Sequence, residues 1–242
     1  MPAPDQTSVL NRLLSLMESE DFQTLSPRLE YVEMPKGYSI AEPDQLLPWA
    51  YFPEKGIISI VAVSPEGQEV EAGIIGRDGF APTALLMGSD QTPHRINVQV
   101  PGAAYRIERE TFLKTFEGSA SLRQLLLRYV QTLTTQGAYT SLSNAVHPID
   151  ERLARWILMC DDRNGGRDLE LTQDFISTML AVRRPSVTTA LHVLEGNGFI
   201  RAERGCIIIR DRQRLEQFAG DAYGKPEAEY SRLIGPMNEA LG

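Results

Sequence analysis

Residues 171–210, LTQDFISTMLAVRRPSVTTALHVLEGNGFIRAERGCIIIR, contain the most regular pattern in this chain. Phe175, Ile176 and Met179 have the spacing of one apolar helix face. A second apolar stripe follows, formed by Val187, Ala190, Leu191 and Leu194. Pro185 suits the first turn of this second helix, where its missing N–H has no consequence. The pattern predicts two short helices joined by a tight turn.

A β-hairpin is predicted directly after the two helices. Phe199–Ala202 and Cys206–Ile209 are β-prone and flank the turn-forming Glu203-Arg204-Gly205. Two helices and a hairpin, with Arg183 and Arg184 where the second helix begins, form the layout of a winged helix-turn-helix, which inserts a helix end into the DNA major groove. On periodicity alone, an ordinary helical hairpin followed by a β-hairpin is the alternative.

The charge of the chain is distributed unevenly. The 242 residues, enough for two domains, have a formal net charge of −8. Residues 150–215 carry 11 Arg against 10 Asp and Glu, whereas residues 1–149 have a net charge of −6 and residues 216–242 one of −3. The charge therefore permits DNA binding through a local arginine surface, with weak non-specific affinity.

Composition predicts a cytoplasmic protein without metal or cofactor. No apolar run approaches the roughly 18 residues that span a bilayer, and the start MPAPDQTSVL lacks the basic and apolar regions of a secretory signal. Cys160 and Cys206 form neither a disulfide framework nor a CxxC metal site. His94, His147 and His192 have no ligand spacing, and no Ser/His/Asp set stands out, so an enzyme is not expected.

Residues 29–108 are rich in short β-prone runs separated by Pro and Gly turns. The runs are Leu29–Val32, Tyr51–Phe52, Ile57–Val63, Val70–Ile75, Ile96–Val100 and Ala104–Ile107. Many short strands at this spacing are typical of a sandwich or a small barrel.

Residues 119–145 contain no proline and predict one long helix. A coiled-coil-like seam with alternating spacings of four and three runs along it. Its apolar members are Leu122, Leu126, Tyr129 and Leu133. We expect this seam to form a dimer interface; the alternative is that it packs on the chain's own β-domain. The helix must break near His147-Pro148, which makes residues 145–150 a candidate hinge.

The β-rich part, the long helix and the helix-turn-helix segment, in this order, resemble the Crp/Fnr family of bacterial transcription regulators over nearly the whole chain. LTQDFISTMLAVRRPSVTTALHVLEGNGFI is similar to the family's helix-turn-helix pattern, with its (S/R)R.(T/S)V core. RGCIIIRDRQRLEQFA resembles the wing and the helix after it, and PKGYSI and PWAYFPEKGIISI resemble two N-terminal strands.

The resemblance implies an α+β fold in three parts. Residues 1–118 would form a β-roll, a double-stranded β-helix like that of cyclic-nucleotide-binding domains. Residues 119–147 would form the dimerisation helix and hinge, and residues 148–242 the winged helix-turn-helix. The resemblance also implies a homodimer that binds a near-palindromic operator in double-stranded DNA and either contacts RNA polymerase or blocks it.

The resemblance also implies roles for residues at the DNA. Arg184 takes the position of the family's base-reading arginine, whose bidentate contact with guanine contributes about 1–3 kcal/mol of discrimination. Ser186 and Arg183 are expected to contact phosphates, which fix the register. Arg204 is expected to contribute from the wing. The alternative for the two adjacent arginines is that they are solvated or ion-paired.

Two departures from the family pattern concern the operator. Pro185 stands where the family often has a glutamate, so an acceptor for cytosine N4 is lost, and Thr189 stands where it has a second polar reader. Thr188 and Thr189 remain as candidate base readers. We therefore expect a half-site that differs from the family's familiar one.

The expected sensor pocket departs from the family's cyclic-nucleotide cassette, G-E…A-L…R-(S/T)-A. Gly76 fits the glycine, and Arg95 is the candidate for the phosphate-binding arginine. Arg77 stands where the ribose-binding glutamate is expected, and the Ser/Thr-Ala pair is absent. We expect weak or absent cAMP binding. Arg77 and Arg95 would serve either another anionic small-molecule effector or ion pairs with Glu69 or Glu71.

The sequence thus predicts a cytoplasmic, homodimeric DNA-binding transcription regulator with an unknown effector and no membrane attachment. The net charge of −8 and Pro185 motivate one alternative from another class, a signalling or interaction module of the same fold that has lost specific DNA binding.

Overall fold

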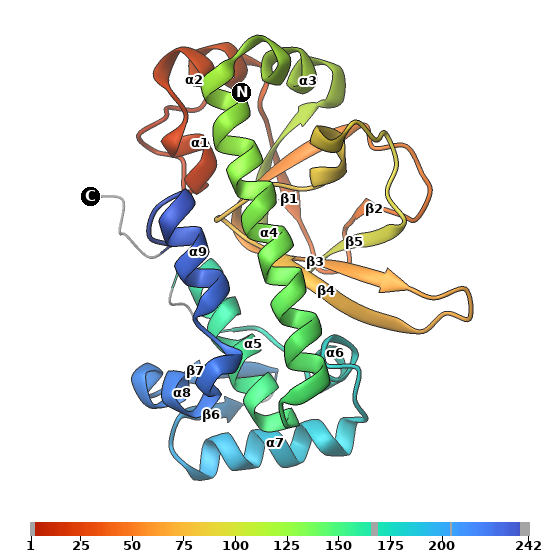
Figure 1. The fold of residues 1–242 in the computed structure, drawn as a ribbon, viewed down its shortest axis with the longest axis vertical. Helices are drawn as coiled ribbons and strands as arrows, with labels where there is room; N and C mark the ends of the chain where they lie inside the picture. Colours follow the sequence, from red (N-terminus) through yellow and green to blue (C-terminus); the bar gives the residue numbers. More distant parts are fainter. Residues whose placement is uncertain (1–2, 166–168, 204, 238–242) are drawn as a thin grey trace.

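The computed structural model describes residues 3–165, 169–203 and 205–237. The molecule is elongated, with a β-rich part at one end and a helical part at the other (Figure 1). We call residues 12–118 the β-roll region and residues 149–219 the helix-turn-helix region. Helix α4, Ala120–Val146, runs alongside both (Figure 1). This mixture of sheet and helix confirms the predicted α+β class.

The β-roll region contains one antiparallel sheet with the strand order β1-β5-β3-β4, and β2 pairs with β5. The strands are β1 (Glu30–Met34), β2 (Ser39–Ala41), β3 (Trp49–Val63), β4 (Glu69–Ile75) and β5 (His94–Glu108). Four of the runs predicted from sequence join into β3 and β5, each 15 residues long. Irregular pairing near Pro53 and Lys55 lets β3 bend without leaving the sheet.

Short helices cover the end of the sheet farthest from the helix-turn-helix region (Figure 1). They are α1 (Arg12–Leu16), α2 (Ser19–Leu25) and α3 (Arg109–Gly118), with 3-10 turns η1 (Ser26–Arg28) and η2 (Thr83–Met87). An aromatic cluster lies beneath them. The ring of Phe80 has its centroid 5.6 Å from that of Phe52, 5.7 Å from that of Phe112 and 5.5 Å from that of Tyr129. Because Tyr129 belongs to α4, this cluster attaches α4 to the sheet.

The seam of α4 that was expected at a dimer interface faces this core instead. Leu122, Leu126 and Tyr129 are fully buried, and Leu133 packs against the same cluster. Gln136 extends the buried face, because its Oε1 accepts a hydrogen bond from Ile74 N (2.7 Å) and its Nε2 donates to Ile74 O (3.1 Å). Ile74 lies on the edge strand β4, whose backbone groups need such partners. The seam therefore packs on the chain's own β-roll.

The helical part begins where the sequence predicted a break. Helix α4 ends at Val146, and α5 begins at Ile149 with Pro148 as its N-cap residue. The remaining elements are α5 (Ile149–Asn164), α6 (Gln173–Met179), α7 (Arg184–Gly196), β6 (Ile200–Glu203), β7 (Cys206–Ile209), α8 (Arg212–Ala219), η3 (Gly220–Ala222) and α9 (Lys225–Leu233). Helix α9 leaves the helix-turn-helix region and packs along α4 (Figure 1).

The two regions meet in a buried contact around Glu71 of β4. Apolar side chains of the sheet, among them Ile57 and Ile74, belong to the same buried cluster as the cores of α5, α6 and α7. Within it, Glu71 accepts hydrogen bonds from Ser59 Oγ (2.6 Å) and from Trp156 Nε1 of α5 (2.9 Å). Burial raises the pKa of Glu71 from its ordinary 4.5 to about 7, although both hydrogen bonds oppose the shift.

The pH dependence of stability should reveal this carboxyl group. Because its folded pKa lies above its unfolded pKa, its contribution to the free energy of unfolding is complete below pH 4.5 and is lost as the pH rises through about 7. Glu71→Gln cannot ionise; its carbonyl oxygen can accept from Trp156 Nε1, and its amide group can donate to Ser59 Oγ. We expect it to abolish this loss of at most about 3 kcal/mol. Urea unfolding at about pH 5 and about pH 8 measures it. Identical pH dependence in both proteins would contradict the assignment.

Candidate nucleic-acid interface

Helices α6 and α7 are joined by the predicted tight turn. Thr172 caps α6, since its Oγ1 accepts a hydrogen bond from Phe175 N (3.3 Å). The turn passes through Ala181, whose φ of +50° lies in the left-handed region. Helix α7 then begins at Arg184, with Pro185 in its first turn as expected.

One face of α7 is buried and the opposite face is exposed. The apolar stripe predicted from sequence is buried in the core of the helix-turn-helix region; it consists of Val187, Ala190, Leu191 and Leu194. A rotation of about 100° per residue places a second set of residues on the other side. This outward face consists of Pro185, Thr189, His192 and Gly196, all of which are exposed. Helix α7 lies at the base of the molecule (Figure 1).

Arg183 and Arg184 are both exposed at the N-terminal end of α7. Arg184 lines a groove of about 640 Å³ together with residues of α6 and of the β6–β7 hairpin. The N-terminus of a helix carries a partial positive charge, which adds to that of the two arginines. This end of α7 is therefore suited to a phosphate or to the acceptor groups of a base.

The hydroxyl groups of the two threonines on α7 are already used as donors within the protein. Thr188 Oγ1 donates to Gln173 Oε1 (3.1 Å) and to Arg184 O (3.2 Å), and Thr189 Oγ1 donates to Pro185 O (3.1 Å). These threonines can still accept hydrogen bonds through their oxygen lone pairs and make apolar contacts through their methyl groups. They could therefore contact an amino group of a base or the methyl group of thymine. Ser186 is half-buried on the flank of α7.

The β6–β7 hairpin forms the predicted wing and is joined to α7. Glu195 Oε1 accepts a hydrogen bond from Ala202 N (3.0 Å), and Arg201 forms an ion pair with Glu203 (2.8 Å). Arg204, which was expected to contact DNA, lies outside the described residues.

Two residues of this surface, His192 and Gln173, were not among the candidates predicted from the sequence. His192 lies in the middle of the outward face of α7, seven positions after Pro185. Its position two helical turns after Pro185 places it on the same face, whereas its spacing from the other histidines carries no such information. The position of Gln173 beside Thr188 could not be predicted from the sequence, because the two residues lie on different helices.

The three effector-pocket candidates do not lie together. Arg95 forms ion pairs with Glu42 (3.2 Å) and with Glu69, which confirms the expected pairing with Glu69. Gly76 and Arg77 follow the other end of β4 from Glu69. Because β4 rises about 3.3 Å per residue, the two sites are about 20 Å apart.

The loop at residues 76–79 is occupied by the chain's own groups. The carbonyl groups of residues 77, 78 and 79 accept hydrogen bonds from Arg12 N (2.7 Å), the Tyr230 hydroxyl (2.7 Å) and Asn11 Nδ2 (2.8 Å), respectively. A Cβ atom added to Gly76 would lie 2.6 Å from Cβ of Arg163 on α5. The loop therefore contacts α1, α5 and α9, and its carbonyl groups are already bonded to protein donors.

Cys160 is buried, Cys206 is half-buried, and no disulfide joins them. No three His, Cys, Asp or Glu side chains in the described part of the chain lie together as metal ligands would. None of the helices described is both long enough and apolar enough to span a membrane.

Comparison with protein families agrees with this geometry. Residues 151–218, from α5 to α8, match the family model of the Crp-like helix-turn-helix domain. No curated protein matches the chain. The chain therefore carries a Crp-like helix-turn-helix domain.

Solved structures resemble the chain over most of its length. A regulator assigned to the Crp/Fnr family from Eubacterium rectale is 20% identical, with 86% of this chain and 97% of that chain covered at a TM-score of 0.65. FixK2 from Bradyrhizobium japonicum is 16% identical, with 78% and 96% covered at 0.65. A CooA mutant from Carboxydothermus hydrogenoformans is 15% identical, with 90% and 98% covered at 0.62. The expected resemblance to the Crp/Fnr fold is confirmed.

Cyclic AMP should not bind this protein. Arg77 replaces the ribose-binding acid, Arg95 is ion-paired away from the loop, and the loop carbonyls have protein partners. Isothermal titration is expected to give no binding heat up to about 1 mM cAMP. A cyclic-nucleotide-binding protein titrated in parallel serves as the positive control, and micromolar affinity for this chain would overturn the expectation.

Proposed function

We propose that this chain, with a Crp-like helix-turn-helix domain on the Crp/Fnr fold, is a homodimeric, sequence-specific DNA-binding regulator of transcription. Two copies bind the half-sites of a near-palindromic operator, about 34–36 Å apart. Contact with RNA polymerase, or blocking of it, then alters transcription in the cytoplasm. Any effector is a small molecule other than cAMP.

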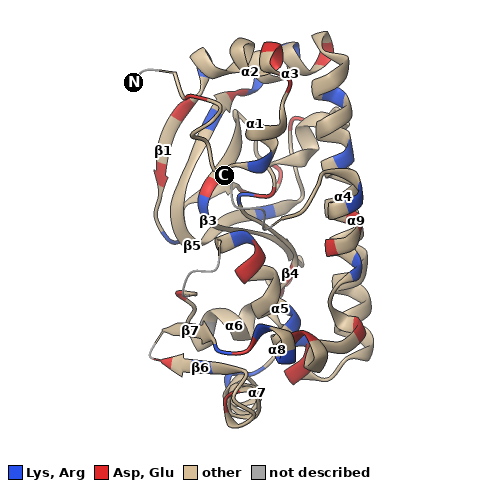
Figure 2. Cartoon of the chain, turned by 90° about the vertical axis from the view of Figure 1, so that its left-hand side faces the viewer, with Lys and Arg blue, Asp and Glu red and all other residues tan. Residues whose placement is uncertain are grey.

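The observation that carries this proposal is the exposure of α7 at one end of the molecule. Figure 2 views α7 nearly along its axis at the base, beside the β6–β7 hairpin. Its outward face is exposed along its whole length, and Arg183 and Arg184 mark its N-terminal end. A helix supported from behind and free in front has the geometry that the major groove accepts.

We assign the DNA contacts by position on α7. Arg184, in the first turn, contacts guanine O6 and N7, and Arg183 and Ser186 contact phosphates. Thr188 and Thr189 accept hydrogen bonds from base amino groups or contact thymine methyl groups. Arg204 contacts a phosphate from the wing.

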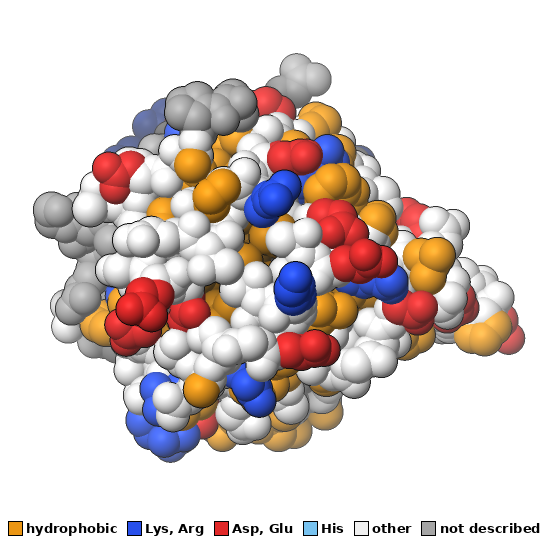
Figure 3. Space-filling view, turned by 90° about the horizontal axis from the view of Figure 1, so that it is seen from above, with side chains coloured by type: hydrophobic (Ala, Val, Ile, Leu, Met, Phe, Trp, Pro, Cys, Tyr) orange, Lys and Arg blue, Asp and Glu red, His pale blue; other side chains and the backbone are white. Residues whose placement is uncertain are grey.

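The net charge of residues 150–215, which contain α7, is +1, whereas that of the whole chain is −8. At the opposite end of the molecule, over α2 and α3, acidic and basic side chains are interspersed (Figure 3). With a total charge of −8, the chain has little general attraction to DNA, so affinity depends on the local contacts of α7. Non-specific binding should therefore be weak at physiological salt.

We propose that the dimer forms through the face of α4 that points away from the β-roll core. Leu127 and Leu142 are 44% and 46% exposed on this face, and Thr134 and Ala138 between them are small enough for close approach of a second helix. The helix has 27 residues and is therefore about 40 Å long. Pairing of two copies along it would set the distance between their α7 helices.

Arg184→Ala should weaken binding to the selected operator by roughly 10- to 100-fold, because a bidentate arginine–guanine contact is lost. Arg183→Ala should weaken binding to all DNA sequences alike. It should also reduce the slope of log affinity against log salt concentration by about 1, the value of one phosphate contact. Fluorescence anisotropy at several salt concentrations measures both. Arg232→Ala on α9, an exposed arginine paired with Glu229, is the matched control and should bind normally.

Equal affinity of the Arg184→Ala variant for operator DNA would refute the base-reading role of this residue. Failure of the unaltered protein to bind any genomic fragment at low salt would favour the alternative, an interaction module of the same fold. A discrete footprint with steep salt dependence supports the regulator.

The two faces of α4 should respond differently to substitution. Leu127→Glu combined with Leu142→Glu should give folded monomers, because two charges then face the partner helix. Leu126→Ala should instead lower the free energy of unfolding by about 2–5 kcal/mol, since Leu126 is fully buried in its own chain. Analytical ultracentrifugation and urea unfolding measure the two effects.

Leu46→Glu is the matched control for the first effect, because Leu46 is 64% exposed and lies in the loop between β2 and β3. It should leave the dimer intact. If the Leu127→Glu, Leu142→Glu double variant remains dimeric, the interface does not lie on this face of α4.

A further inference from the structure

The C-terminal part of the chain links the two regions of the molecule. It begins at the helix-turn-helix region, where the Tyr223 hydroxyl donates to Asp162 Oδ2 of α5 (2.8 Å) and accepts from Arg212 Nη2 (2.9 Å). Arg212 also forms ion pairs with Asp161 and Asp162. These contacts fix the start of α9 to α5. The match to the Crp-like domain ends before this point, at residue 218.

Seven residues later, the same segment is buried in the β-roll region. Tyr230 on α9 is only 1% exposed and belongs to the hydrophobic core of the β-roll region. Its hydroxyl donates to the carbonyl of Asp78 (2.7 Å), and Met237 is buried in the same core. Helix α9 thus spans from the helix-turn-helix region to the β-roll core along the side of α4 (Figure 1).

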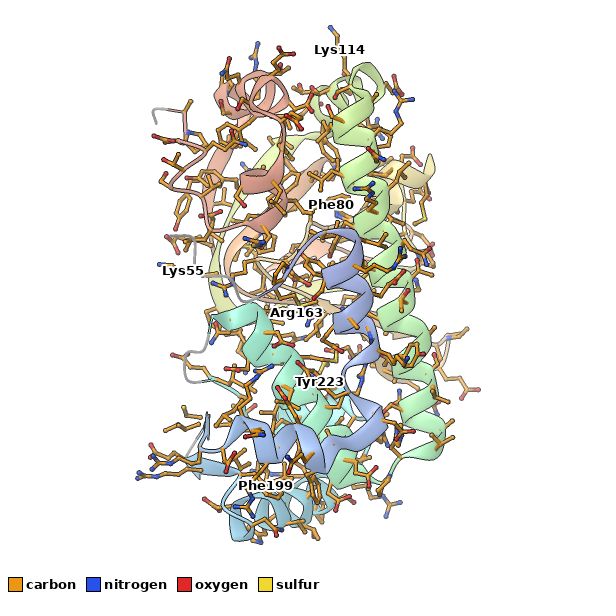
Figure 4. All side chains as sticks on the ribbon, turned by 60° about the vertical axis from the view of Figure 1, so that its left-hand side comes forward. Lys55, Phe80, Lys114, Arg163, Phe199 and Tyr223 are labelled. Carbon is orange, nitrogen blue, oxygen red and sulfur yellow. The ribbon has the colours of Figure 1, made fainter. Side chains whose placement is uncertain are left out.

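Asp78 contacts α5 as well as α9. Its carboxylate accepts a hydrogen bond from Gly76 N (2.8 Å) and pairs with Arg163 Nε at the end of α5 (3.0 Å), and both side chains of this pair are almost fully buried. Figure 4 shows Arg163 between Phe80 of the β-roll core and Tyr223 of the C-terminal segment. One residue of the 76–79 loop therefore contacts two elements from the C-terminal half.

Two attachments restrict motion more than one does. The helix-turn-helix region is held at the sheet by the buried contacts around Glu71 and by the Asp78–Arg163 pair. Helix α9 adds an attachment from the C-terminal side, which opposes rotation about those contacts. Moving the region would leave a buried carboxylate and a buried carbonyl without partners, which is strongly unfavourable. The arrangement therefore favours one defined orientation.

We propose that Tyr230 and Asp78 are positioning residues for DNA recognition, which fix the orientation of the helix-turn-helix region relative to the β-roll and α4. In a dimer joined through α4, this orientation sets the distance and the rotation between the two α7 helices. A change of one base pair between half-sites shifts one of them by about 3.4 Å and rotates it by about 34°. The attachment of α9 to both regions therefore makes the protein select one half-site spacing. This consequence for DNA rests on the proposed function.

The first experiment measures orientation without DNA. Spin labels are attached at Lys114→Cys on α3 and Gln217→Cys on α8, both exposed, in a Cys206→Ser background; Cys160 is buried. Labelled chains are diluted with unlabelled protein, so that each dimer carries one labelled copy. Pulsed electron paramagnetic resonance should give one narrow distance distribution. Tyr230→Ala should broaden or shift it, and Arg232→Ala, on the exposed side of α9, should not.

The second experiment measures operator spacing. The unaltered protein should prefer one half-site spacing by roughly tenfold over spacings one base pair longer or shorter. In Tyr230→Ala this preference should fall to about threefold or less, while the affinity for a single half-site stays the same. Loss of stability alone would lower the affinity for operators of every spacing equally. The ratio of affinities between spacings is therefore the decisive value.

Tyr230→Leu covers the case in which Tyr230→Ala does not fold, because it keeps most of the apolar volume and removes the hydroxyl group. It should also broaden the distances and relax the spacing preference. An unchanged distance distribution and an unchanged spacing ratio in a folded Tyr230 variant would overturn the proposal. If the unaltered protein binds no DNA, the proposed function fails, and the distance measurement still decides whether α9 fixes the orientation.

Discussion

A carboxylate and a guanidinium, from Asp78 and Arg163, are buried together between the β-roll and the helix-turn-helix region. Each charge would be costly to bury alone, and removal of one partner of such a pair typically costs about 3–5 kcal/mol. The pair therefore keeps the end of α5 against the loop at residues 76–79. The loop in turn holds α1 and α9 through its carbonyl groups, so the arrangement of the C-terminal half depends on this contact.

The same loop bears on the expectation that cAMP binds weakly or not at all. A ligand-binding loop has to present unoccupied backbone and side-chain groups to a ligand. In this chain, the backbone carbonyl groups of residues 77 to 79 are bonded to protein donors. Arg95 lies about 20 Å from this loop and is paired with Glu42 and Glu69. A ligand that donates to these carbonyl groups would have to displace the internal hydrogen bonds.

Helix α4 runs alongside both the β-roll region and the helix-turn-helix region. Through Tyr129 and Gln136 it is attached to the aromatic core and to the edge strand β4. Its opposite face remains exposed, and α9 packs along its side. A displacement of α4 would therefore affect the sheet and α9 and, in the proposed dimer, the partner helix.

The sequence by itself determined the elements with strong local signals. The stripe from Val187 to Leu194, Pro185 in the first turn of α7 and the break at Pro148 were predicted correctly, because prolines and helical spacing act over a few residues. Periodicity also identified the apolar seam of α4, but it could not say what covers such a seam, and the seam packs on the β-roll. Tertiary structure alone decided that Arg95 lies away from Gly76, that Gln173 contacts Thr188, and that Tyr230 is buried beside Asp78. These pairings join residues 15 to 152 positions apart, and such contacts depend on how the chain packs, which no local pattern encodes.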